Sequence, residues 1–288
     1  TGILRDFVFG ATDAALLELT DERLRVWVDD EVISRPSVTS TVSSGTFGAS
    51  TGWTLTASTG ATCTISGGYL NMTASAIGSS ALAKQTVTTS SANVEHALRI
   101  IVDRGPVTFR CGSTDGGDEY VSETSLSTGE HSLAFTPTGS YYIQFESTAP
   151  VLRRVDSIEV ESAGAMSLPT VWGSGELGLY RSAQSADVVF VALEGHLQKR
   201  IERRAARSWS IVDYEVDAGP FTGARTANVK LTPGATKGNT TLTASGSFFR
   251  AEHVGSLFRL FHSGQLVDVS LAGSGTFTPA IVVTGISD

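Results

Sequence analysis

Apolar and polar residues alternate with a period of two near the start of the chain. Residues 15–19 and 24–28 are two such runs, and the polar residues 20–22 lie between them. Alternating runs joined by a short polar turn are typical of a β-hairpin. A second polar turn follows before Val32 and Ile33. The pattern therefore predicts an antiparallel meander rather than a helix over this segment.

Residues 37–164 are rich in Thr, Ser, Gly and Ala, and short candidate strands follow one another at regular intervals. In one of these strands Tyr141, Ile143 and Phe145 share a face. Many short alternating strands with turn residues between them favour a β-sandwich or jelly roll.

The chain from Met166 onward mixes apolar strands with charged residues. Residues 186–193 form an apolar run that suits a buried strand. Within the basic stretch 196–216, residues 199–207 could be helical, but their Arg-rich alternation also fits a pair of strands exposed on one side, and we favour strands. Further strands are expected at 227–233, 240–245 and 257–261, a turn at 219–221, and a turn of helix at 251–254.

The whole pattern predicts an all-β, mostly antiparallel fold with three segments. Residues 1–36 begin a β-rich core, 37–164 form an inserted jelly-roll or sandwich domain, and 165–288 continue the core. A hydrophobic content of 41% is sufficient for one core or two, and 30 glycines suit many tight turns.

Charge and hydropathy exclude some classes of function. A net charge of −8 argues against a surface built to hold nucleic-acid phosphates. No run approaches the roughly 20 apolar residues that cross a bilayer. Cys63 and Cys111 lack the spacing of a zinc site, and we expect two reduced thiols, although a bridge between them stays open. The first residue is Thr and the last run stops just after a strand-like segment, so we expect a piece of a longer polypeptide.

Most motifs of catalysis and cofactor binding are absent from the sequence. It contains no nucleophile elbow, no phosphate-binding loop and no HExxH helix. The five histidines are scattered, and we expect each to be a hydrogen-bond partner: His96, His131, His196, His253 and His262. We therefore expect no enzyme, no cofactor and no catalytic or metal-ligating set.

One acidic cluster merits a test against this expectation. Asp115, Asp118 and Glu119 surround a Gly-Gly turn, where carboxylate oxygens could bind a hard cation such as Ca²⁺. A solvated turn explains the same residues, and we favour it. Paired carboxylates could also hydrolyse a glycan, which is the weakest of the functional alternatives.

Aromatic residues of the middle segment could form a platform on which sugars stack. The candidate glycan-binding residues are Trp53, Tyr69, Tyr141 and Tyr142, with Tyr120 near them. Trp53 and Tyr69 occupy strand positions, where packing in a core is the usual role.

The only strongly basic stretch could contact DNA phosphates along a channel or lie at a subunit interface. Its members are Lys199, Arg200, Arg203, Arg204 and Arg207. Glu202 within the run and the acidic remainder weaken the DNA interpretation. Salt bridges between subunits, or a solvated face, are the alternatives that we favour.

Three stretches resemble the tail nozzle proteins (tail tubular protein B-like) of short-tailed bacteriophages. They are LRDFVFGATDAALLELTDERLRVWVDDEVI near the start, LPTVWGSGELGLYRSAQSADVVFVALEGHLQKRIERRAARSWSIVDYEVDAGPF in the third segment, and VKLTPGATKGNTTLTASGSFFRAEHVGSLFRL further on. The matching positions of the second stretch are Pro169, Trp172, Glu176, Leu177, Leu179, Gln184, Ser185, Ala186, Asp187, Phe190, His196, Leu197, Trp209, Gly219, Pro220 and Phe221. Ala14 and Ala15 replace an aromatic of the family pattern, and Thr20-Asp21 replaces a Phe-Gly pair.

This resemblance covers about the first 35 residues and most of 166–288. It implies a non-catalytic virion protein of the phage tail that forms a ring, expected to be a hexamer, around the DNA channel. Adaptor and fibre proteins of the tail, and DNA in transit, are its implied partners. The segment between is similar to carbohydrate-binding modules and is expected to project outward. A receptor- or glycan-binding tail protein, recognising a host surface glycan, is therefore the alternative function.

Overall fold

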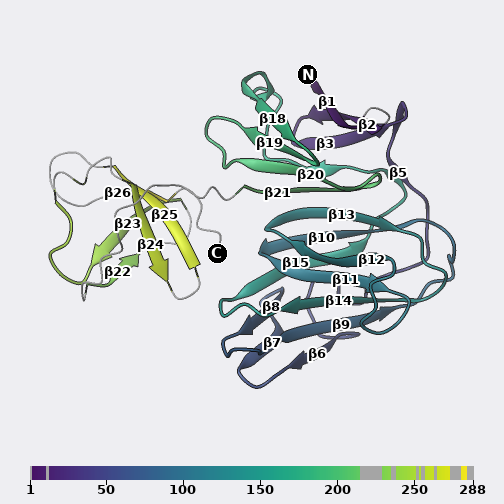
Figure 1. Cartoon of the computed structure of the whole chain (residues 1–288), viewed down its shortest axis with the longest axis horizontal. Coiled ribbons are helices and arrows are strands. Elements are labelled where there is room, and N and C mark those ends of the chain that lie inside the picture. Colours follow the sequence, from purple (N-terminus) through teal and green to yellow (C-terminus); the bar gives the residue numbers. More distant parts are fainter. Residues whose placement is uncertain are drawn as a thin grey trace. The chain divides into compact units, whose positions relative to one another are not determined.

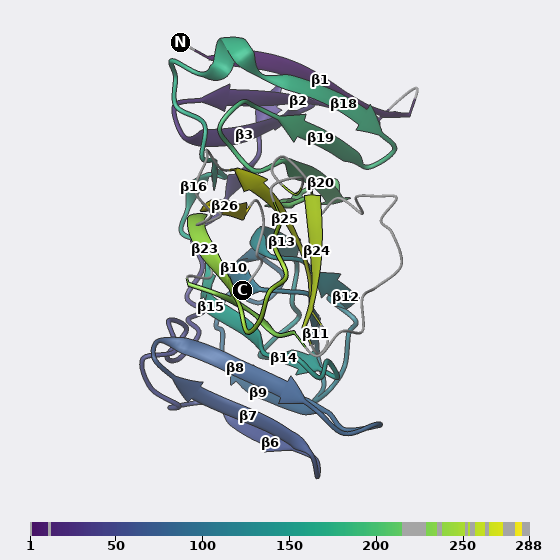
Figure 2. The same ribbon diagram turned by 90° about the vertical axis from the view of Figure 1, so that its left-hand side faces the viewer.

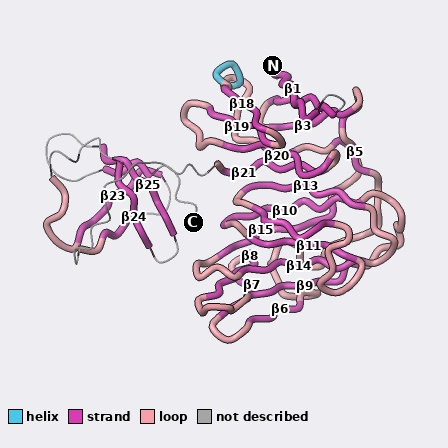
Figure 3. Tube along the Cα trace, in the orientation of Figure 1, coloured by secondary structure: helices cyan, strands magenta, loops and turns pink. Residues whose placement is uncertain are grey.

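The computed structural model is built almost entirely from β-strands, as the alternation predicted (Figure 1). It describes residues 2–10, 13–214, 229–234, 238–250, 253, 257–262, 265–272 and 280–283. The described strands pair antiparallel throughout, and a single 3-10 turn, η1 (Leu177–Leu179), is seen as a short helix in Figure 3. The chain divides into two compact units, residues 1–214 and 215–288.

The predicted meander at the start of the chain is confirmed. β1 (Ile3–Gly10), β2 (Asp13–Thr20), β3 (Arg23–Val28) and β4 (Glu31–Val32) pair in sequence order. A strand from the third segment, β17 (Leu168–Pro169), completes this five-stranded sheet by pairing with β3. The start of the third segment thus joins the first segment in one sheet.

The middle segment supplies a second sheet of five strands in the order β12-β11-β14-β9-β6. These strands are β6 (Thr54–Ala57), β9 (Ala81–Val87), β11 (Val107–Gly112), β12 (Val121–Leu126) and β14 (Tyr141–Ser147). β14 lies at the centre, hydrogen-bonded to β11 on one side and to β9 on the other.

A nine-stranded sheet runs through both the middle and the third segment, in the order β18-β19-β20-β21-β13-β10-β15-β8-β7. From the middle segment come β7 (Ala61–Ser66), β8 (Tyr69–Ala74), β10 (His96–Arg104), β13 (Gly129–Phe135) and β15 (Arg153–Val160). From the third come β18 (Arg181–Ser185), β19 (Val188–Ala192), β20 (Lys199–Ala205) and β21 (Ser208–Asp213). The strand interpretation of the basic stretch is thus confirmed.

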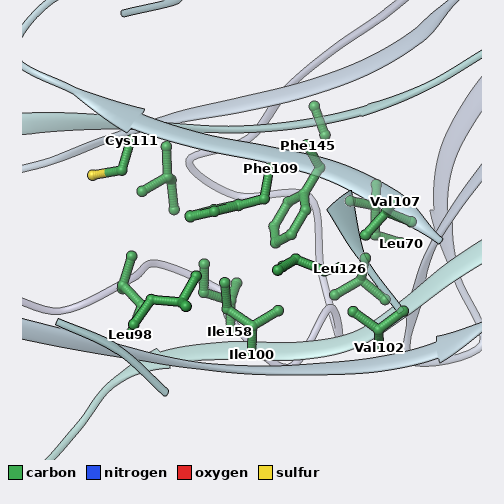
Figure 4. Close-up of a cluster of buried hydrophobic side chains, with 14 of the residues drawn as sticks. Leu70, Leu98, Ile100, Val102, Val107, Phe109, Cys111, Leu126, Phe145 and Ile158 are labelled. Carbon is green, nitrogen blue, oxygen red and sulfur yellow. The ribbon is translucent and has the colours of Figure 1, made fainter. Parts of the chain in front are cut away.

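The nine-stranded sheet carries one hydrophobic core on each of its two faces. Across the β13–β21 pairing, His131 lies opposite Ser210 and Ser132 lies opposite Trp209. The first pair shares its face with Leu133, which belongs to the core of the middle segment (Figure 4). Trp209 points to the other face, into a core built from residues 3–33 and 166–211. On the β13 side of this pairing the sheet therefore buries one face against the core of the middle segment. On the β21 side it buries the opposite face against the second core.

The two cores follow the segment boundaries drawn from composition. All members of the middle core lie between Val42 and Val160, and the second core contains none of these residues. At the boundaries themselves β5 (Ser34–Arg35) pairs with β16 (Gly164–Ala165), so the strand that leads into the middle segment lies beside the strand that leads out of it. Because β13 and β21 are also paired, the middle segment continues the core's own sheet rather than hanging from a linker.

The third segment does not form one body with the first throughout its length. Residues 165–214 belong to the first unit, whereas the second unit begins at Glu215. Its five strands follow the order β22-β23-β26-β25-β24. They are β22 (Leu231–Pro233), β23 (Gly238–Ala244), β24 (Leu257–His262), β25 (Gln265–Ala272) and β26 (Ala280–Val283). The three strands expected here are confirmed, while the turn at 219–221 and, apart from His253, the helical turn at 251–254 lie outside the described residues.

Candidate functional site

Two of the four proposed glycan-binding aromatics are core residues. Trp53 is 7% exposed and packs against Phe47 at 5.3 Å between ring centroids. Tyr141 is fully buried, with Phe135 at 5.0 Å and the His96 ring at 5.7 Å. The expectation that Trp53 and Tyr141 present their rings to a sugar is therefore wrong. Burial also raises the pKa of Tyr141.

The other two aromatics lie on opposite outer faces of the middle sandwich. Tyr69 alternates with the core residue Leu70 on β8, and the guanidinium of Arg154 covers its ring at 4.2 Å. Tyr142 is on the outer face of the other sheet, because its neighbours on β14, Tyr141 and Ile143, point into the core. The four residues thus do not form one platform.

Tyr142 shares its outer face with a buried glutamine that the sequence analysis did not single out. Gln144 is 5% exposed, two residues along β14. Its cross-strand neighbours are Lys84 on β9 and Arg110 on β11. A β-carbon built on Gly116 would lie 3.8 Å from its Oε1, so the loop of residues 113–119 passes over the amide. Within the described residues no group hydrogen-bonds to this amide.

The acidic loop above Gln144 is held by its own hydrogen bonds. Asp115 pairs with Lys84 at 2.9 Å, and Asp118 accepts a hydrogen bond from the backbone N–H of Glu123 at 3.1 Å. Glu119 accepts one from the N–H of Ser113 at 2.9 Å. Its own backbone N–H and that of Ser113 hold the pKa of its carboxyl below the usual range. No group of three or more His, Cys, Asp or Glu side chains that could hold a metal ion occurs within the described part of the chain.

Two members of the basic run lie on the face of β20 that also carries the core residue Ile201. Arg203 pairs with Asp13 at 2.6 Å and with Asp187 at 3.4 Å, and Lys199 pairs with Asp213. The partners of Arg203 come from strands β2 and the β18–β19 turn, so this arginine ties the two sheets of the second core together.

Arg200 and Arg204 lie on the other face of β20, on either side of Glu202. The carboxylate of Glu202 lies 3.1 Å from Arg200 and 2.7 Å from Arg204. Arg204 also donates to the hydroxyl of Thr124 at 3.1 Å. The fifth member, Arg207, pairs with Glu95 at 2.5 Å. Each charge of the run therefore has a carboxylate partner inside this chain. The DNA contact, the salt bridges between subunits and the solvated face stay predictions.

The densest ionic network lies where the chain enters and leaves the middle segment. Arg35, whose side chain is 2% exposed, donates to Glu161 at 2.8 Å and to Glu95 at 3.1 Å. It also donates to the hydroxyl of Ser132 at 2.8 Å and to the backbone oxygen of Arg207 at 3.0 Å. We call this network, with Arg99 and Glu130, the junction. It joins residues of all three segments.

The pKa values of two buried carboxylates of the junction are shifted in opposite directions. Burial alone would raise the pKa of Glu161, but Arg99 and Arg35 outweigh it and hold the pKa below its usual range. For Glu130 burial prevails and the pKa is raised, because Arg99 lies 3.5 Å away and compensates only in part. Glu161 is thus a fixed negative charge between two arginines.

The histidines with described partners act as hydrogen-bonding groups, as expected. His131 is fully buried, donates from Nε2 to the Ser127 oxygen at 2.9 Å and accepts from the Ser210 hydroxyl at 2.8 Å. Burial lowers its pKa to about 3, so the ring is neutral. His96 bonds to the Ser40 hydroxyl at 2.5 Å, and His196 to Glu176 at 3.0 Å. The side chain of His262 lies outside the described residues.

The two cysteines are free thiols. Burial raises the pKa of Cys63 to about 11 and that of Cys111 further, so neither is a thiolate near neutral pH. In the described residues no helix is long and apolar enough to cross a membrane.

Comparison with known proteins adds no identification. No family model, no curated protein and no solved structure matches the chain.

Proposed function

We propose that this chain is a structural, non-catalytic subunit of a phage tail of the nozzle type. In this proposal the subunit forms part of a ring around the path of the DNA, with other tail proteins as its neighbours. The sequence stretches that resemble nozzle proteins support it, and so does the way in which those stretches fold together.

One observation carries the proposal: the nozzle-like stretches at the two ends of the first unit build a single core. Phe7 and Trp209 meet at 5.0 Å between ring centroids. The Glu22 backbone N–H donates to the Trp172 oxygen at 2.9 Å, and the Gln184 amide bonds both the N–H and the oxygen of Val8. Figure 2 shows β18 and β19 beside β1 and β2. Trp172, Gln184 and Trp209 are all matching positions of the resemblance, so its residues act as one structural set.

The electrostatics of the chain suit a conduit for DNA. Phosphates are held by unpaired Lys and Arg side chains, and each such contact strengthens binding. The basic run has its charges matched by carboxylates, and the net charge is −8. A wall with little attraction for phosphate would let DNA slide during ejection.

Electron microscopy of the purified chain and of the intact particle tests the proposal. We expect rings of a fixed number of copies, placed at the tail in the particle, with residues 1–36 and 166–214 in the ring body. Assembly into a distal trimeric fibre, or a monomer at all concentrations, would contradict it.

A further inference from the structure

The sheet β1-β2-β3-β17 has a free edge at β1. Within the described residues β1 pairs only with β2, and β18, which lies beside it in Figure 2, does not pair with it. The backbone N–H and C=O groups on the open side of an edge strand are a template for pairing with another chain. The edge of β1 can therefore accept a further strand.

A side-chain amide of the chain itself already occupies one end of this edge. The Val8 N–H donates to Oε1 of Gln184 at 3.2 Å, and Nε2 of Gln184 donates to the Val8 oxygen at 2.8 Å. A residue of a neighbouring antiparallel strand makes the same two bonds with its backbone. Both backbone groups of Val8 thus point away from β2, and a peptide-like group is bound to them.

Two further residues of β1 present their backbone groups to the same side. The register of β1 with β2 is regular from Ile3 to Val8. Because the backbone groups of successive residues point to alternate sides of a strand, those of Leu4 and Asp6 point outward like those of Val8. Within the described chain no group bonds to these outward N–H and C=O groups. Leu4 and Asp6 are therefore open to the ladder bonds that Gln184 imitates at Val8.

The outer face of this edge is apolar apart from one carboxylate. Leu4 is 66% exposed and Val8 is 59% exposed, and Asp6 lies between them on the same face. In the described structure the Asp6 side chain has neither an ion-pair nor a hydrogen-bond partner. Exposed apolar side chains on an edge strand are typical of a site of association. A strand bound here would cover Leu4 and meet the unpaired charge of Asp6.

The inner face of the edge carries an arginine that lacks a carboxylate. Arg5 alternates with Leu4 and Asp6 and therefore shares its face with Phe7, a residue of the second core. Its Nε is buried without a hydrogen-bond partner, and no carboxylate among the described residues pairs with its guanidinium. Its charge acts on the Tyr180 hydroxyl and offsets part of the burial that raises the pKa of that group. A buried donor without an acceptor is unfavourable, and a carboxylate is the strongest acceptor for a guanidinium.

We propose that the free edge of β1 binds an extended segment of another polypeptide, which adds to the sheet as an antiparallel strand. Its backbone bonds to Leu4 and Asp6, and an acidic side chain of the segment pairs with Arg5. On the outer face a basic residue lies opposite Asp6 and an apolar residue opposite Leu4. From its N-terminus the segment thus reads basic, acidic, apolar, and Gln184 ends the ladder at Val8. This site goes beyond the structural function proposed above, and a chain that forms rings but binds no such segment would keep the first proposal and lose the second.

The test selects short random peptides, each displayed on its own mRNA, for binding to the full chain. The affinity of the most enriched peptide is then measured by fluorescence anisotropy. We expect enrichment of the basic, acidic, apolar triplet. Leu4→Pro removes an outward N–H that the pairing with β2 does not use, and it should weaken binding by about tenfold or more. Leu4→Ala keeps this N–H and should weaken binding by about threefold at most.

Arg5→Glu tests the charge. It should weaken binding of the selected peptide by about tenfold, and a peptide with Lys in place of the acidic residue should restore it. Arg25→Glu, on the outer face of the same sheet, is the matched control and should stay within about twofold of the wild type. The proposal is overturned by no enrichment, by enriched peptides without an acidic residue, by a Leu4→Pro affinity within about twofold of the wild type, or by no recovery with the Lys peptide. A melting curve for each variant separates loss of binding from loss of fold, and the charge exchange decides the matter even where Leu4→Pro does not fold.

Discussion

Two glutamines on neighbouring strands of the five-stranded sheet are buried to the same extent but differ in their partners. Gln85 on β9 is 4% exposed, accepts from the Ser43 backbone N–H at 2.7 Å and donates to the Ser43 oxygen at 2.9 Å. Gln144 on β14 is 5% exposed and has no such partner in the described chain. Gln85 holds a segment of chain in place and Gln144 does not, so burial alone does not distinguish a polar group that stabilises the fold from one that the fold does not use.

The junction is the extreme case of partnered polar groups. There Arg35 bonds two carboxylates, a hydroxyl and a backbone oxygen at once. Such groups stabilise the fold only as a complete set, because removing one member leaves another charge buried without compensation. Removal of a partnered polar side chain should therefore be costly, and removal of an unpartnered one should not.

The largest effect is expected for Arg35→Met. The substitution leaves Glu161 with Arg99 alone in a site where its side chain is 7% exposed. We expect a loss of about 3–5 kcal/mol in the free energy of unfolding, measured with urea. Arg25→Met is the control, since its pair with Glu18 is more exposed and should cost less than about 1 kcal/mol. Equal losses in the two variants would contradict the role assigned to the junction.

Tyr141, Gln144 and the β13–β21 pairing show which contacts can be predicted from the sequence and which cannot. Tyr141, Ile143 and Phe145 stand at every second position of β14, which indicates that they share a face. Because their side chains are large and mostly apolar, burial of that face is expected. The burial of Gln144 arises from the loop at 113–119, which passes over it. Strand alternation cannot show that contact. The pairing of β13 with β21 joins residues far apart in the chain, and no local pattern specifies it.

A second prediction concerns the stability of the fold in acid, which depends on the hydrogen-bonded imidazole of His131. Its pKa is about 3 in the folded chain, below the ordinary histidine value of 6.5, so the unfolded chain binds more protons between these values. Its contribution to stability is complete above pH 6.5 and is lost as pH falls towards 3. Arg204 is the charged group that opposes protonation here.

The measurement is the free energy of unfolding of the wild type and of His131→Gln at pH 6.5 and 4.5. The wild type should lose about 2.3 kcal/mol more than the variant over this interval, because the slope rises to about 1.4 kcal/mol per pH unit only below the unfolded-state pKa of 6.5. Carboxylates such as Glu161 affect both proteins alike and cancel in the difference. Parallel pH curves for the two proteins would show that the ring is not held neutral.

The third prediction tests the partnered member of the glutamine pair. Gln85→Met leaves the Ser43 N–H and oxygen without their partner inside the sandwich. We expect a loss of about 1–3 kcal/mol in the free energy of unfolding, because a buried backbone group then loses its hydrogen bond. Faster hydrogen exchange at the Ser43 amide should accompany it. Unchanged exchange would mean that the glutamine does not hold this segment.

The smallest effect is expected for the same substitution at the unpartnered member. Gln144→Met removes an amide that no group of the described chain hydrogen-bonds, and it adds an apolar side chain of similar length beside the stems of Lys84 and Arg110. The free energy of unfolding should stay within about 0.5 kcal/mol or increase, because the unfolded chain no longer gives up hydration of that amide on folding. Urea unfolding beside Gln85→Met makes the comparison direct, since the two substitutions are chemically identical on adjacent strands. A loss for Gln144→Met as large as that for Gln85→Met would mean that the Gln144 amide already stabilises the fold, and the two glutamines would then not differ in the role of their amides.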